Sequence, residues 1–157
     1  MDDISVARVL HVLAIIHWIG GLAFVTLIVL PMSRSRGTVE QAWSLFENIE
    51  QRFSQQVRIS IPLAGATGLW MTYRMDIWDR FADLEYWWMT AMFGLWLAFM
   101  LMVFVVEPHF HPKFAKNAQR DQEKVLLRVS RLHQCLLSLA ALTAFGAVAG
   151  SHGVRFF

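Results

Sequence analysis

The sequence has little charge. Only 17% of its 157 residues are Asp, Glu, Lys or Arg, and four long runs contain none of them: residues 9–33, 59–73, 86–106 and 132–154. A soluble domain of this size needs a larger polar surface to cover its core. The missing charge therefore excludes a soluble enzyme and a nucleic-acid-binding protein.

Cysteine is almost absent as well. The single Cys135 lies in the last uncharged run. One cysteine cannot form a disulfide within the chain, so a secreted disulfide-stabilised scaffold is excluded.

Hydrophobic residues are abundant, at 56% of the chain. About 20 apolar residues in a helix cross a bilayer. The sequence thus predicts one all-α domain over residues 1–157, an integral membrane four-helix bundle with spans near 5–30, 57–75, 86–107 and 128–150. We expect the first helix to stop before Pro31, and the segment 107–112, which holds Pro108 and Pro112, to end the third, because proline lacks an N–H donor.

A helical extension is predicted before the second span. Residues 39–53 are polar, but Trp43, Phe46, Ile49 and Phe53 recur at helical spacing. Thr38 and Gln41 form a capping-box pattern at its start.

The distribution of Lys and Arg predicts the orientation. With four spans, the first and third loops share one side and hold ten of the 14 basic residues. The positive-inside rule then places this side, with the helical extension, in the cytoplasm, and both termini outside. We expect a multi-pass protein of a bacterial inner membrane, surrounded by lipid.

Six histidines stand out. His11, His17 and His133 fall within predicted spans, and His152 follows the last one. Ionisable residues inside a membrane are costly and mark candidate functional sites. The alternative for each is a neutral histidine hydrogen-bonded to a neighbouring helix. His109 and His111 follow Glu107 at a predicted boundary, where a solvated cluster is favoured over a loop metal site.

Histidines on facing helices of a bundle are typical ligands of haem. We therefore predict b-type haem, with its iron held by histidines of the first and last helices, and rank His11 first and His133 second. The candidate metal ligands are His11, His17, His133 and His152. Arg8, Arg74 and Arg155 are placed to meet haem propionates at the outer rim, with simple contact to the membrane surface as their alternative role.

Two other functions stay open. Copper is the first alternative, because thioether and imidazole groups suit Cu(I) and four methionines are predicted near the outer face: Met71, Met75, Met89 and Met92. The second is a structural subunit of a respiratory complex without its own cofactor.

Several segments resemble a known family. They are Leu10-His11-Val12-Leu13, His17-Trp18-Ile19-Gly20-Gly21 and Leu30-Pro31, then residues 46–53, Ile61-Pro62 and Thr67-Gly68-Leu69. They resemble the copper-resistance protein D-like superfamily, which includes HemJ-type protoporphyrinogen oxidases. The resemblance implies haem ligation by His11, or copper handling. The third predicted helix lacks the lysine that is typical of the HemJ branch. The additional histidines His133 and His152 suggest a different set of ligands, which is more similar to that of small membrane b-type cytochromes.

Together these features predict a membrane-embedded b-type haem protein for electron transfer. Quinone and a periplasmic or membrane redox protein are the expected partners. Oxidoreductase activity on its own substrate and a homo-oligomer both stay open. Gly146 and Gly150 form a GxxxG pattern, which predicts close contact with a neighbouring helix.

Overall fold

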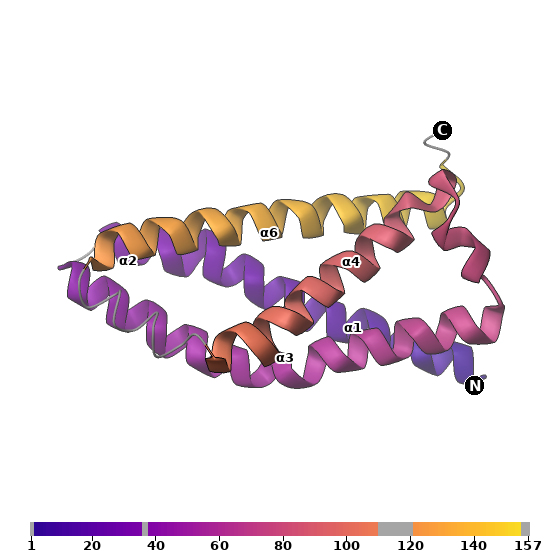
Figure 1. Ribbon diagram of the computed structural model, residues 1–157, viewed down its shortest axis with the longest axis horizontal. Coiled ribbons are helices and arrows are strands. Elements are labelled where there is room, and N and C mark those ends of the chain that lie inside the picture. The colour runs from indigo at the N-terminus through magenta and orange to yellow at the C-terminus, as the bar shows by residue number, and fades with distance from the viewer. Residues whose placement is uncertain (1, 36–37, 110–120, 155–157) are drawn as a thin grey trace.

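The computed structural model describes residues 2–35, 38–109 and 121–154, and their secondary structure is entirely helical. Four long helical stretches run along the molecule, and the start of the first stretch and the end of the last lie at the same end of it (Figure 1). The stretches are α1 (Asp3–Phe24) with η1 (Val25–Val29) and α2 (Leu30–Ser35), α3 (Val39–Met75), α4 (Trp87–Leu101) with η4 (Met102–Val106), and α6 (Gln122–Ser151). The short 3₁₀ helices η2 (Trp78–Phe81) and η3 (Leu84–Tyr86) connect α3 to α4.

Three of the four stretches are long and apolar enough to cross a membrane. They are Asp3–Ser33, Leu84–His109 and Gln122–Ser151, which agree with the first, third and fourth predicted spans. The chain is thus an all-helical protein with the features of a multi-pass membrane protein. The predicted span 57–75 lies within α3, which is not among the three, since the uncharged stretch of α3 between Arg58 and Arg74 covers only residues 59–73.

Helix α3 is continuous over 37 residues, so the predicted extension and the helix that follows it are one element. The capping box is confirmed: the Gln41 backbone N–H donates to Thr38 Oγ1, and the Thr38 N–H donates to Gln41 Oε1. α3 ends at Asp76, which adopts a left-handed conformation (φ 50°).

The first helix does not stop before Pro31, so that expectation was wrong: Pro31 lies within α2. The helix that contains Pro108 is described as far as His109, inside the predicted end segment 107–112, and residues 110–120 lie outside the described part of the chain. A π-helical turn precedes each proline: the N–H groups of Leu30 and Glu107 donate to carbonyls five residues back, those of Val25 and Met102. The wider turn gives the proline ring room and removes the need for its missing N–H.

Two apolar clusters hold the helices together. The cluster nearer α2 joins Val25 and Leu30 to Phe46 of α3 and Val129 of α6. The other cluster joins α1, α3 and α4 through Trp18, Leu22, Val57, Ile61, Phe99 and Val103. Trp18 meets Phe99 edge-to-face, with ring centroids 4.8 Å apart.

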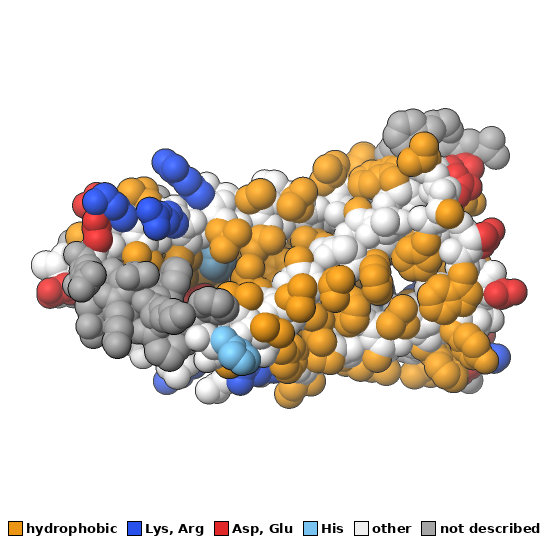
Figure 2. All heavy atoms as spheres, viewed as in Figure 1, with side chains coloured by type: hydrophobic (Ala, Val, Ile, Leu, Met, Phe, Trp, Pro, Cys, Tyr) orange, Lys and Arg blue, Asp and Glu red, His pale blue; other side chains and the backbone are white. Residues whose placement is uncertain are grey.

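Hydrophobic side chains cover much of the face shown in Figure 2, and several Lys and Arg side chains gather toward the α2 end. Ile16, Leu27 and Phe145 each expose more than 60% of their surface. This distribution is typical of a surface in contact with lipid, whose tails are as apolar as the side chains.

The prediction for the GxxxG pattern is confirmed. A Cβ atom on Gly146 would lie 2.6 Å from Cζ2 of Trp87, and one on Gly150 would collide with the indole of Trp88. The two glycines therefore make room for tryptophan side chains of α4.

Candidate cofactor site

His11 projects from α1 toward α3. Its Nδ1 lies 2.8 Å from the carbonyl oxygen of Ala64 and 3.2 Å from Oγ1 of Thr67. A carbonyl only accepts, so Nδ1 carries the proton and donates it, which leaves the lone pair of Nε2 free. A Cβ on Gly68 would lie only 3.1 Å from the His11 ring. Glycine at this position therefore lets the imidazole lie against α3.

His17 is held through both ring nitrogens. Nε2 lies 3.2 Å from Oε1 of Gln56, and Nδ1 lies 3.1 Å from Oγ of Ser60. The consistent tautomer donates Nε2–H to the amide oxygen and accepts the Ser60 hydroxyl at Nδ1. Neither nitrogen then has a lone pair left for a metal, which matches the alternative of a neutral, hydrogen-bonded histidine.

His133 and His152 bond within their own helix. His133 Nδ1 lies 3.0 Å from the carbonyl oxygen of Val129, and His152 Nδ1 lies 2.8 Å from that of Val148. The half-buried His133 ring also meets Phe46 of α3 edge-on, with centroids 6.0 Å apart. His152 is exposed at the end of α6. Both rings keep Nε2 free.

The structure does not bring these four histidines together. Val129 of α6 and Val25 of η1 belong to the same apolar cluster. α6 runs antiparallel to α1 (Figure 1), so His133, one turn after Val129, is roughly level with Gly21, one turn before Val25. His11 lies about 15 Å farther along α1, at 1.5 Å per residue. His152 lies beyond His11 by a similar distance. Within the described ranges, no group of three or more His, Cys, Asp and Glu side chains is placed to hold a metal ion.

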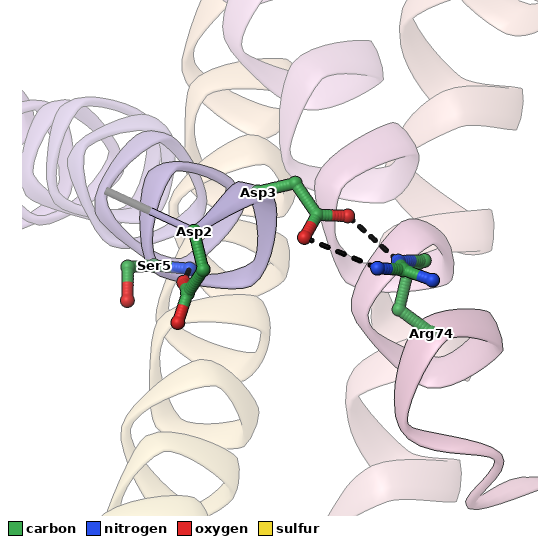
Figure 3. Close-up of polar contacts among 4 residues, drawn as sticks. All are labelled: Asp2, Asp3, Ser5 and Arg74. Atoms are coloured by element: carbon green, nitrogen blue, oxygen red, sulfur yellow. Dashed lines mark hydrogen bonds and ion pairs between the residues drawn. The ribbon is translucent and has the colours of Figure 1, made fainter.

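The predicted rim arginines have different surroundings. Arg74 Nε lies 2.6 Å from Oδ2 of Asp3, and this ion pair joins the end of α3 to the start of α1 (Figure 3). The neighbouring Asp2 caps α1 by accepting the backbone N–H of Ser5. Arg8 is exposed, and Arg155 lies outside the described residues.

The methionines of the copper alternative share one end of the molecule. Met71 and Met75 lie in the last turns of α3, and Met89 and Met92 in the first turns of α4. Met89 is buried, whereas Met75 is 42% exposed.

Of the two histidines that follow Glu107, His109 Nδ1 lies 2.8 Å from the carbonyl oxygen of Val105 in its own helix. His111 lies outside the described residues.

A polar cluster that was not predicted from the sequence lies around Glu107. Its carboxylate accepts the Ser54 hydroxyl and lies 3.6 Å from Nη2 of Arg58. Glu50 is one turn from Ser54 on the same face of α3. The protein packed around Glu50, with Glu107 and Glu47 nearby, raises its pKa to about 7, although the side chain reaches the surface. The four-residue spacing of Glu50, Ser54 and Arg58 predicts that these polar side chains share one face of α3. Glu107 lies in another helix, so the spacing could not predict that its carboxylate meets this face.

Comparison of the chain with protein-family models, with curated proteins and with solved structures finds no match, so no family is identified.

Proposed function

We propose that this chain is a multi-pass membrane protein that binds b-type haem through His11 and transfers electrons within the membrane. One observation carries the proposal: the Ala64 carbonyl fixes Nδ1 of His11 as the donor and leaves Nε2 as a ligand. Metal-binding histidines usually donate their other ring nitrogen in this way, which orients the ring and raises its basicity.

Three of the four predicted ligands, His11, His133 and His152, keep Nε2 free. His133 and His152 lie at other levels along the molecule than His11, so the arrangement seen here does not bring two of these histidines to one iron, and His11 is the proposed histidine ligand. Bound haem supplies a one-electron oxidation and reduction. The surrounding apolar helices exclude water and so tune the potential.

The proposed setting is a bacterial inner membrane with both termini outside and α2 at the cytoplasmic side. The uneven distribution of Lys and Arg supports it, as does the position of the start of α1 and the end of α6 at the same end of the molecule (Figure 1). In this setting, quinone and a periplasmic or membrane protein are the proposed redox partners.

Haem content per protein, measured as pyridine haemochrome, tests the proposal. The wild-type protein should show a Soret band and sharp α and β bands when reduced. His11→Gly should lose most of its haem, and added imidazole should restore it, because free imidazole replaces the missing ligand. His17→Ala is the matched control and should retain haem, since both nitrogens of His17 are already engaged.

A wild-type protein that binds no haem would overturn the proposal. So would a His11→Gly variant that keeps its haem and an unchanged spectrum. A colourless protein that binds Cu(I) would favour the copper alternative instead.

A further inference from the structure

Helix α6 carries basic side chains near its N-terminal end, on the side that faces away from the bundle. Lys124, Arg128 and Arg131 follow one another at spacings of four and three residues, so they share one face of the helix. All three are exposed. Val125 and Val129 on the other side of α6 are buried in the apolar cluster nearer α2.

The length of α6 sets the depth of the two arginines. Gln122–Ser151 is a candidate membrane span. Its residues 132–151 contain no charged side chain, and they extend over about 30 Å, which is the thickness of the hydrocarbon core. Arg128 and Arg131 come directly before this stretch. When α6 crosses the membrane, their guanidinium groups therefore lie at the level of the phospholipid headgroups.

Arg128 and Arg131 lack a carboxylate partner. All 12 Asp and Glu residues of the chain lie in its described part, and none of them forms an ion pair with either arginine there. Arg128 is close enough to Asp121 to lower the pKa of that carboxyl, but Nζ of Lys124 already binds it at 2.6 Å. Two like charges three residues apart on a helix repel each other. An anion between the two guanidinium groups relieves this repulsion.

Apolar side chains continue the same side of α6 beyond the arginines. Leu132, Leu139 and Leu142 expose 46%, 48% and 56% of their surfaces. A surface with a basic end and an apolar continuation matches a lipid with an anionic headgroup and acyl chains. Acyl chains do not distinguish one phospholipid from another here, whereas a guanidinium binds two phosphate oxygens through its planar fork of N–H donors.

We propose that Arg128 and Arg131 bind the headgroup phosphate of an anionic phospholipid whose acyl chains lie along α6. Phosphatidylglycerol keeps the full negative charge of its phosphate. Phosphatidylcholine has the same phosphate, but its own cation offsets that charge and is repelled by the two arginines. The site therefore selects anionic lipid, as basic clusters at the end of a membrane helix do.

Quenching of a dye on Cys135 by brominated lipids tests this site. Cys135 is the only cysteine of the chain, is exposed, and lies one turn from Arg131. The labelled protein is reconstituted in equal amounts of phosphatidylglycerol and phosphatidylcholine, with bromine on the acyl chains of one lipid or the other. The wild-type protein should prefer phosphatidylglycerol roughly tenfold beside the dye. This preference should fall in about 1 M salt, which screens exposed charges.

Arg128→Gln and Arg131→Gln should each lower the preference roughly threefold, and the double variant should bring it close to one. Arg80→Gln is the matched control, because it removes the same charge in η2, at the other end of the molecule (Figure 1). It should leave the preference unchanged. Circular dichroism checks that each variant is folded.

Equal quenching of the wild-type protein by the two brominated lipids would refute the lipid site. An equal loss of preference in Arg80→Gln and Arg128→Gln would also refute it, because net charge alone would then explain the effect. Inorganic phosphate that displaces the lipid better than chloride of the same ionic strength would identify a site for free phosphate instead. These outcomes are independent of the haem proposal, since the readout needs no haem.

Discussion

The membrane histidines differ in what holds their ring nitrogens. His11, His133 and His152 each place Nδ1 against a backbone carbonyl, whereas His17 is bonded at both nitrogens by side chains of α3. A carbonyl dictates the tautomer because it can only accept. The same residue type is therefore suited to metal binding in one place and to joining helices in another.

The raised pKa of Glu50 predicts how stability depends on pH. Its carboxyl binds a proton more tightly in the folded protein, with a pKa of about 7, than at its ordinary value of 4.5. The contribution of Glu50 to the free energy of unfolding should therefore be greatest below about pH 4.5, fall as pH rises to about 7, and change no further above that. Glu50→Gln should remove this part of the pH dependence, seen as a smaller drop in melting temperature between pH 4.5 and 7.5 in detergent.

Asp121→Asn is the control for that measurement. The partly exposed Asp121 carboxylate accepts hydrogen bonds from Lys124, which lower its pKa. Its loss should not reduce the drop above pH 4.5. An unchanged pH profile in Glu50→Gln would show that Glu50 titrates normally.

At the scale of helices, the packing of α6 on α4 depends on missing side chains. Gly146 and Gly150 leave space that Trp87 and Trp88 occupy. Overpacking a well-filled contact costs about 1–3 kcal/mol.

Gly146→Leu and Gly150→Leu should therefore each lower the melting temperature of the detergent-solubilised protein by roughly 2–10 °C. Gly94→Ala is the control, because Gly94 in α4 has nothing within 4 Å of its missing Cβ. That substitution should be neutral or slightly stabilising, since alanine favours a helix. If the leucine variants melt like the wild type, the indoles do not occupy this space.

At the scale of the whole molecule, α3 decides the topology. It lies along α1 from the Asp3–Arg74 ion pair at one end to the contact of Gly21 with Phe53 farther along. α3 is not among the three candidate spans, so whether it crosses beside α1 sets the number of crossings. Four crossings put both termini on one side, whereas three would separate them.

Reporter fusions distinguish these two topologies. With both termini outside, alkaline phosphatase should be active when fused after Phe157 and inactive when fused after Arg120, because the enzyme folds only outside the cytoplasm. Fusions of a fluorescent protein that folds only in the cytoplasm should give the opposite pattern. The reverse result would invert the orientation, and a reporter at the N-terminus on the opposite side from Phe157 would exclude α3 as a span.

The sequence by itself determined the helices and the three candidate membrane spans. Uncharged runs of sufficient length specify spans locally, and the Thr38 and Gln41 cap depends only on neighbours in the chain. Tertiary structure decided how each histidine is held and where Glu107 lies, because hydrogen-bond partners such as Ala64, Gln56 and Ser54 come from other helices. It also decided that Pro31 and Pro108 are accommodated, since π-helical turns are not visible in the hydrophobic pattern. Periodicity shows which face of a helix is apolar, but the packing of two helices sets their relative depth, and depth determines which polar groups meet.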